Sequence, residues 1–197
     1  MSLSATTQEP EAMNSTLEQL QSATNKLELP QYVLDSSLEI YMQSYKNNLY
    51  NGRSIESILG ATIYISCREN DIARRPNQIA DCVGCTEREL MNTVQHFKDR
   101  LNISLKPSTP SSYATEFLSK LEVTPETYDA ALEIADMSFD SSVFSGRSAA
   151  GLAAGAIYAA STLTGEKIKQ ADIQDVSGVS TVTIRKNYPE QREMYVN

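Results

Sequence analysis

An internal repeat with an offset of 94 residues constrains the fold of this 197-residue chain more than any other feature. The segment NGRSIESILGATIYISC begins at residue 51, and SGRSAAGLAAGAIYAAS begins at residue 145. The same offset aligns IADCVGCT at 79–86 with IQDVSGVS at 173–180, without a gap. Matches at several places and a single offset indicate that the chain consists of two copies of one structural unit.

Each copy is predicted to be all-helical, because no segment alternates apolar and polar residues as a half-buried strand does. Ser54 and Ser148 each follow a Gly-Arg pair and precede an apolar run, so both are predicted helix N-caps. Five helices are expected in each copy, over residues 13–27, 31–48, 54–69, 76–82 and 87–101, and then 111–121, 125–139, 148–164, 170–176 and 181–194.

The two copies are expected to form two domains joined near Pro107 and Pro110, which interrupt helix formation. We expect residues 1–12 to be disordered, residues 13–105 to form the first repeat, and residues 106–197 to form the second.

The third helix of each copy is nearly apolar on all sides and rich in Gly and Ala, so we expect it to lie inside its domain. The segment 149–165 is the nearest candidate for a membrane span, but it falls short of the roughly 18 apolar residues required. The first residues lack the basic start and apolar core of a signal peptide. The composition is that of a soluble globular protein, and no membrane partner is predicted.

Cys82 and Cys85 have the spacing of half a zinc site or of a redox pair. In the second copy, the offset places Val176 and Val179 at these positions, which indicates that both positions require a small apolar side chain. A zinc site would need two further ligands, and only Cys67 and His96 remain. We therefore expect no metal site, no disulfide and reduced thiols.

A helix-turn-helix is predicted near the end of each copy. In the second copy, a short helix containing Ile173 and Val176 is expected to end at Gly178, which can adopt the left-handed conformation of a C-cap. Ser180 is then expected to cap the next helix. DNA-binding versions of this motif place the first residues of the second helix in the major groove.

The start of that last helix contains side chains suited to DNA. Arginine can donate two hydrogen bonds to guanine, valine or threonine can contact a thymine methyl, and helix-start amides favour phosphate. In the first copy, the equivalent helix starts with Glu87-Arg88-Glu89, whose two carboxylates would repel phosphates. DNA recognition is therefore predicted for the second copy, through Thr181, Val182, Thr183, Arg185 and Lys186.

The formal net charge of −8 does not favour nucleic-acid binding, but the acidity is unevenly distributed. Residues 1–165 contain 12 basic and 20 acidic side chains, whereas residues 166–192 contain five basic and four acidic ones. The predicted DNA-binding end is therefore the less acidic part of the chain.

Four segments resemble the core of the general transcription factor B family, called factor IIB in eukaryotes. They are the paired GRS segments, KPSTPSSYATEFLSKLEV in the linker, and DIQDVSGVSTVTIRKNY near the end. The resemblance covers roughly residues 15–195 and implies two tandem five-helix cyclin-like repeats. These would bind a TATA-box-binding protein on double-stranded promoter DNA, in the nucleoid of an archaeal cell or in a eukaryotic nucleus.

The resemblance also implies residue roles. The second-repeat helix-turn-helix would recognise an element upstream of the TATA box through Val182, Thr183 and Arg185. Arg147 would lie near the DNA backbone, and its counterpart Arg53 would lie near downstream DNA. The residues expected to face the TATA-box-binding protein are Arg88, Lys98 and Arg100.

Three departures from the family pattern limit these expectations. The zinc ribbon and reader segment that engage RNA polymerase are not in this sequence, so polymerase is an expected partner only if an N-terminal region is missing. Pro189 is expected to kink or stop the last helix. Glu87 and Glu89 replace a start that is often lysine-rich, which alters the charge pairing with the TATA-box-binding protein.

Two other function classes remain open. A cyclin-like module that binds proteins, such as a kinase regulator, fits the same fold without any DNA role. An enzyme is not predicted, because no nucleophile–base pair, phosphate loop or carboxylate dyad is recognisable and the chain has one histidine.

Overall fold

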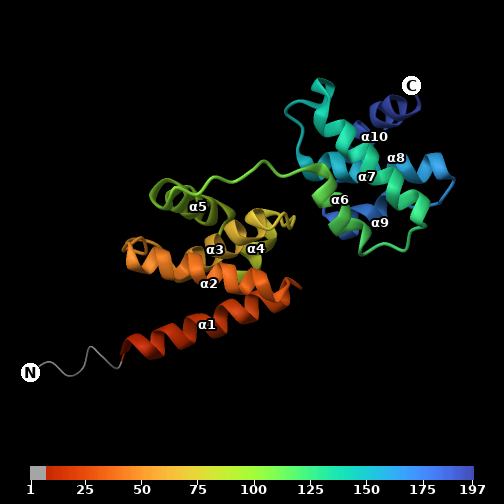
Figure 1. Cartoon of the computed structure of the whole chain (residues 1–197). Coiled ribbons are helices and arrows are strands. Elements are labelled where there is room, and N and C mark those ends of the chain that lie inside the picture. The colour runs from red at the N-terminus through yellow and green to blue at the C-terminus, as the bar shows by residue number, and fades with distance from the viewer. Residues whose placement is uncertain (1–7) are drawn as a thin grey trace, which may run out of the picture. The chain divides into compact units, whose positions relative to one another are not determined.

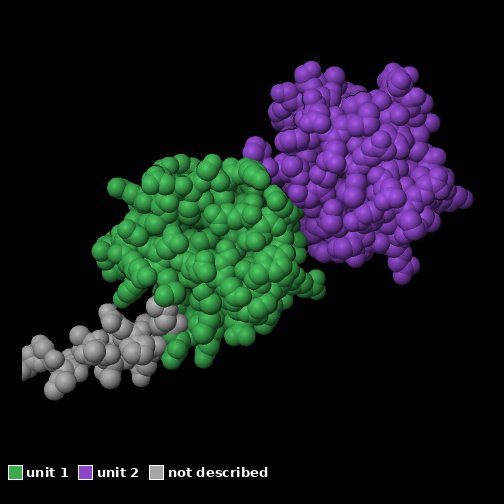
Figure 2. Space-filling view, in the orientation of Figure 1, with its two compact units in different colours: residues 1–106 green, residues 107–197 purple. Residues whose placement is uncertain are grey.

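The computed structural model describes residues 8–197 (Figure 1), and their side chains from residue 14 onward. Within this range the chain is all-α, with ten α-helices and one 3-10 turn. It divides into two compact units, the first ending at Lys106 and the second beginning at Pro107 (Figure 2). Across the described residues, no helix combines the length and apolarity needed to cross a bilayer.

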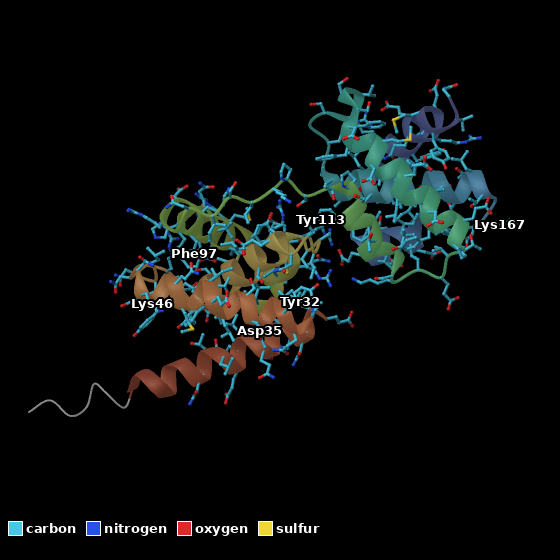
Figure 3. All side chains as sticks on the ribbon, viewed as in Figure 1. Tyr32, Asp35, Lys46, Phe97, Tyr113 and Lys167 are labelled. Carbon is cyan, nitrogen blue, oxygen red and sulfur yellow. The ribbon has the colours of Figure 1, made fainter. Side chains whose placement is uncertain are left out.

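The first unit is built around one central helix. It comprises α1 (Gln8–Lys26), α2 (Gln31–Lys46), α3 (Ile55–Glu69), α4 (Pro76–Val83) and α5 (Glu87–Leu101). Every residue of α3 from Ser57 to Cys67 is buried, because the other four helices pack around it. Phe97 of α5 is fully buried in this core, where it completes the apolar contacts of α3 (Figure 3).

The second unit repeats this arrangement. It comprises α6 (Pro110–Leu118), α7 (Pro125–Asp140), the 3-10 turn η1 (Ser142–Phe144), α8 (Ala149–Thr164), α9 (Gln170–Ser177) and α10 (Thr181–Val196). The Ala- and Gly-rich α8 is central and packs against α6, α7, α9 and α10. Its small side chains permit this close packing on several sides.

All ten predicted helices are present, and most ends agree within two residues. Ser54 accepts a hydrogen bond from the amide of Ser57, and Ser148 accepts one from Gly151, each at 3.2 Å, so both predicted N-caps are confirmed. The prediction of disorder is wrong for residues 8–12, which belong to α1. Glu and Ala favour a helix there, and Pro10 lies in its first turns, where a missing N–H is tolerated. Residues 1–7 of that segment lie outside the described residues.

Candidate nucleic-acid interface

A short turn of defined geometry joins the last two helices. Gly178 ends α9 in the left-handed conformation, with φ of 61°, as predicted. Ser180 accepts a hydrogen bond from the amide of Thr183 at 3.3 Å, which confirms the predicted N-cap of α10. Gln174 Oε1 accepts a further bond from the amide of Thr181 at 3.0 Å. The turn is therefore held by both helices that it connects.

The recognition turn, defined here as residues 181–186, presents an exposed surface that is uncharged at first and then cationic. Val182 is 68% exposed, although it is apolar, and Arg185 and Lys186 are also exposed. Thr183 is half-buried. Arg185 lies along the helix start, with Nε 3.3 Å from the carbonyl oxygen of Thr181 and Nη2 3.2 Å from its hydroxyl. Both hydrogen bonds are long and exposed, so the Arg185 guanidinium is available to another acceptor.

The opposite face of α10 is anchored to α8 by an apolar side chain and two buried amides. Ile184, Asn187 and Gln191 recur on one side of the helix and are all buried. Asn187 donates to the carbonyl oxygen of Gly151 at 2.8 Å, and Gln191 donates to that of Leu152 at 2.9 Å. Sequence analysis missed these amides, although their spacing after Ile184 was a usable signal.

Two glycines in α8 allow this approach. A Cβ added at Gly155 would lie 2.3 Å from Oε1 of Gln191, and one added at Gly151 would lie 3.1 Å from Cγ2 of Thr183. An added side chain would overlap Gln191 at the first position and press against Thr183 at the second, so α10 would have to shift. The backbone of α8 therefore sets the position of α10, including its recognition turn.

Pro189 does not stop α10, contrary to one of the two outcomes predicted for it. The helix continues to Val196. Proline removes one backbone hydrogen bond from a helix interior, so the continuation must come from packing. Gln191, two residues later, is fully buried and donates to Ser138 of α7 at 2.9 Å. Tyr195 donates to Glu133 of α7 at 3.0 Å.

The two arginines of the repeated GRS segments have partners inside their own repeats. Arg147 donates to Asn187 at 3.0 Å and forms an ion pair with Glu190. Arg53 donates to Thr93 at 3.3 Å. Both bonds join residues 40 positions apart, so they are equivalent contacts in the two copies. These two predicted DNA contacts lie away from the recognition turn in sequence.

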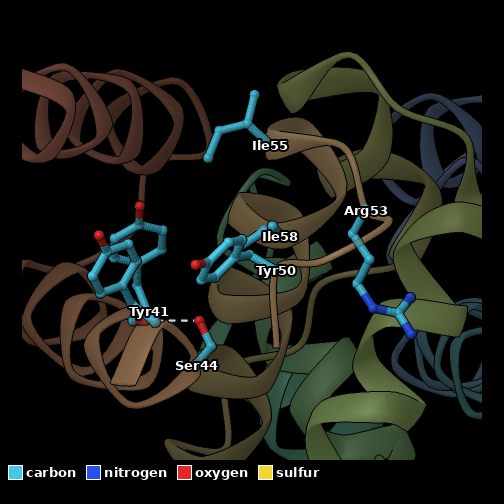
Figure 4. Close-up of a pocket in the computed structure, with 7 residues that line it drawn as sticks. Tyr41, Ser44, Tyr50, Arg53, Ile55 and Ile58 are labelled. Atoms are coloured by element: carbon cyan, nitrogen blue, oxygen red, sulfur yellow. Dashed lines mark hydrogen bonds between the residues drawn. The ribbon is translucent and has the colours of Figure 1, made fainter. Parts of the chain in front are cut away.

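Arg53 lines a cavity of about 230 Å³ between α2 and α3 (Figure 4). Its walls are mainly aromatic and aliphatic. Six of its seven lining residues, displaced by 94 positions, also line a cavity of about 450 Å³ in the second repeat. The shared set in the first repeat is Ser44, Tyr45, Tyr50, Arg53, Ile55 and Ile58. The cavity is therefore a property of the repeat and not of one copy.

The first copy has the same helix-turn-helix backbone with a different helix start. Gly84 adopts φ of 87°, and Thr86 caps α5. Glu89 accepts bonds from the amide and hydroxyl of Thr86 at 2.9 and 2.7 Å, which lowers the pKa of its carboxyl group. Glu89 is therefore a capping-box residue. In the second copy its equivalent is Thr183, so no carboxylate stands at that position.

The three basic residues predicted to face a partner protein lie at or along α5. Arg88 and Arg100 are exposed, and Lys98 is half-buried. Arg88 belongs to the first turn of the helix and the other two to its last turns. They are therefore spread along one helix and do not form a single cluster at the glycine turn.

Cys82 and Cys85 pack partly buried against the core of the first repeat, as expected for positions that valine occupies in the second. Burial raises the pKa of both thiols, and Glu89 and Glu56 raise that of Cys85 further. Among the described residues, no group of three or more His, Cys, Asp or Glu side chains could hold a metal ion.

These pKa shifts predict slow thiol chemistry. A raised pKa lowers the fraction of each cysteine that is thiolate at a given pH. Only the thiolate is nucleophilic, so both cysteines should react slowly. We expect iodoacetamide at pH 8 to modify them several-fold more slowly in the folded chain than in urea, as followed by mass spectrometry of the peptide that contains both. Equal rates in the two conditions would contradict the burial described above.

Fold and site together define a pair of tandem cyclin-like helical repeats, the second of which ends in a helix-turn-helix with an exposed cationic start. The sequence matches the family described as "Transcription factor TFIIB repeat" twice, over residues 10–100 and 103–194. The chain belongs to this family, whose members are transcription initiation factors and not enzymes.

Curated relatives agree with this assignment. The chain is 36% identical over 173 residues to "Transcription initiation factor IIB" of Methanopyrus kandleri, which covers 87% of the chain and 56% of the relative. It is 34% identical over 177 residues to "Transcription initiation factor IIB 3" of Halobacterium salinarum, at 90% and 56% coverage. For Methanocaldococcus jannaschii the identity is 36% over 177 residues, at 90% and 26% coverage. The chain thus spans about half the length of the first two.

Proposed function

We propose that this chain is the core of an archaeal transcription initiation factor. It binds a TATA-box-binding protein on promoter DNA and recognises the element upstream of the TATA box through the second-repeat helix-turn-helix. The observation that carries the proposal is the recognition turn: an exposed Val182 beside an exposed Arg185 and Lys186, on a helix whose opposite face is locked to α8. The names of the archaeal relatives support the same role.

The chemistry of the recognition turn fits base edges in a major groove. The Arg185 guanidinium has the planar donor pair that matches O6 and N7 of guanine. Val182 and the methyl group of Thr183 suit the thymine methyl. Lys186 supplies a phosphate contact, which orients the helix without selecting a sequence.

The remaining partner assignments are part of the proposal. Arg88, Lys98 and Arg100 would contact the TATA-box-binding protein, with Glu87 and Glu89 changing the charge of that surface. Arg53 would lie near downstream DNA. RNA polymerase would be recruited only through a region outside this chain, and no zinc or other cofactor is required by the described residues. The site of action is the chromosomal DNA of the cell.

The Arg185→Ala variant tests the assignment of base recognition. We expect it to lose preference for the upstream element by about 1–3 kcal/mol, because one bidentate base contact is removed. The measurement is the affinity of the complex with TATA-box-binding protein for two duplexes, which share the TATA box and differ only upstream of it.

Arg192→Ala is the matched control, since it removes an exposed cation from the same helix outside the recognition turn. It is expected to keep the preference. An unchanged preference in Arg185→Ala, with normal affinity for both duplexes, would refute the proposed contact. A wild-type chain that binds neither duplex with the partner would refute the proposed function itself.

A further inference from the structure

Three groups within the second repeat hold the guanidinium of Arg147. Nη1 donates to Oδ1 of Asn187 at 3.0 Å, and Nη2 pairs with a carboxylate oxygen of Glu190. The guanidinium carbon lies 4.9 Å from the ring centroid of Phe144. The side chain is only 21% exposed. Two of its five N–H donors and its stacking on Phe144 are therefore used inside the protein.

Arg147 is the first member of a chain of contacts that reaches α8. Its acceptor Asn187 is 2% exposed and donates in turn to the carbonyl oxygen of Gly151 at 2.8 Å. One arginine thereby connects the loop before α8, the buried face of α10 and the first turn of α8. A buried amide with both ends bonded has one orientation available, so this contact defines the rotation of α10 about its axis.

The rotation of α10 decides which side chains of the recognition turn face outward. Asn187 lies one helical turn after Thr183 on the same face. Thr183 itself lies against α8, since a Cβ at Gly151 would come within 3.1 Å of its methyl group. If Asn187 were released, Val182 and Arg185 would change direction with it.

The first repeat supplies an internal comparison. Its equivalent arginine, Arg53, donates only to Thr93 and forms no ion pair within the described residues. The position of Glu190 is occupied there by His96, whose pKa is lowered by burial and then by Arg53 and Arg100. Both repeats therefore have a hydrogen bond from the loop arginine to the last helix. Only the second repeat adds an ion pair with a carboxylate.

We propose that Arg147 is a positioning residue, which together with Glu190 fixes the orientation of the recognition turn and does not itself contact phosphate. The inference rests on the proposed function of α10 as the DNA-recognition helix. The contacts of Arg147 with Asn187 and Glu190 are called the clasp below. The clasp would support recognition of a particular DNA sequence, because a recognition site must be held rigidly by the groups behind it.

The test uses the full chain with an archaeal TATA-box-binding protein and three variants. Arg147→Lys keeps the positive charge but replaces the planar guanidinium, whose two terminal nitrogens bond Asn187 and Glu190 separately, with a single ammonium nitrogen. Glu190→Gln removes the ion pair and leaves the arginine. Lys186→Gln removes an exposed cation of the recognition turn and serves as the phosphate-contact control. The DNA is a pool of duplexes with one TATA box and random base pairs directly upstream.

We expect Arg147→Lys and Glu190→Gln to reduce the enrichment of the preferred upstream sequence roughly tenfold, while the salt dependence of affinity stays that of the wild type. Lys186→Gln should weaken binding to all sequences alike and lower the salt slope by about one. In the free protein, the two clasp variants should accelerate hydrogen exchange at the backbone amides of residues 183–188, 190 and 191, whereas Lys186→Gln should not.

Two results would overturn the inference. One is a salt slope lowered by about one in a variant that removes the arginine charge, Arg147→Gln, with the sequence preference intact, as a phosphate contact requires. The other is tighter binding of every duplex by Glu190→Gln, because that would mean the carboxylate merely withholds the arginine from DNA. If the wild type selects no sequence, the proposed function fails, and the exchange measurement still decides whether the clasp holds α10.

Discussion

The Gly155→Ala variant is expected to lose about 3 kcal/mol of the free energy of unfolding of the second repeat. The added methyl group would lie 2.3 Å from Oε1 of Gln191 and 2.7 Å from Cβ of Asn187. Both neighbours are buried and hydrogen-bonded to α8, so neither can move without leaving a buried polar group unpaired. α10 must therefore move away from α8.

Native-state hydrogen exchange at α8 and α10 measures this effect within the second repeat. Gly165→Ala is the matched control. Unlike Gly155, Gly165 has a positive φ, of 79°, and nothing lies within 4 Å of an added Cβ, so only the left-handed backbone penalty of about 1 kcal/mol applies. Equal losses in the two variants would show that the close approach of α8 and α10 is not what stabilises the repeat.

The Pro189→Ala variant is expected to gain about 2 kcal/mol of stability, in the opposite direction to most substitutions. Proline denies the helix one backbone bond at the carbonyl of Arg185, and alanine restores it. Pro189 is exposed, so no packing is lost. The gain is smaller than the full cost of a helix-interior proline, because alanine also increases the entropy of the unfolded chain.

Pro125→Ala is the control for this change. Pro125 is also exposed, but it occupies the first turn of α7, where no helical bond is missing. There alanine should cost about 0.5 kcal/mol through the unfolded state alone. Urea unfolding of the two variants should therefore shift in opposite directions, and a loss of stability in Pro189→Ala would mean that the proline is an integral part of how α10 docks.

The comparison of the two copies explains why so much of the fold could be predicted from the sequence. A position that is glycine, serine or an apolar residue in both copies is constrained by the repeat itself. Ser54 and Ser148 cap equivalent helices, and the glycines at 84 and 178 end equivalent helices in the left-handed conformation. The same comparison showed that the two cysteines stand where valine stands in the other copy.

Comparison of the two copies determined only part of the predicted DNA-binding site. The recognition turn could be predicted because its residues are local to one helix start. The roles of Arg147 and Arg53 could not, since their partners are 40 residues away and the sequence does not show that the bonds form. Glu89 was interpreted as a charge that repels phosphate, whereas it caps its own helix through Thr86.

What the sequence by itself determined is local or repeated: ten helices, their caps and turns, the two-unit organisation, and an uncharged-then-cationic start to the last helix. These follow from backbone preferences and apolar periodicity, which act over a few residues. The tertiary structure alone decided that α10 continues past Pro189 and that Asn187 and Gln191 fix it against two glycines of α8. Both outcomes depend on free energies of packing between segments distant in the chain, and such contacts outweigh the local preference of any single residue.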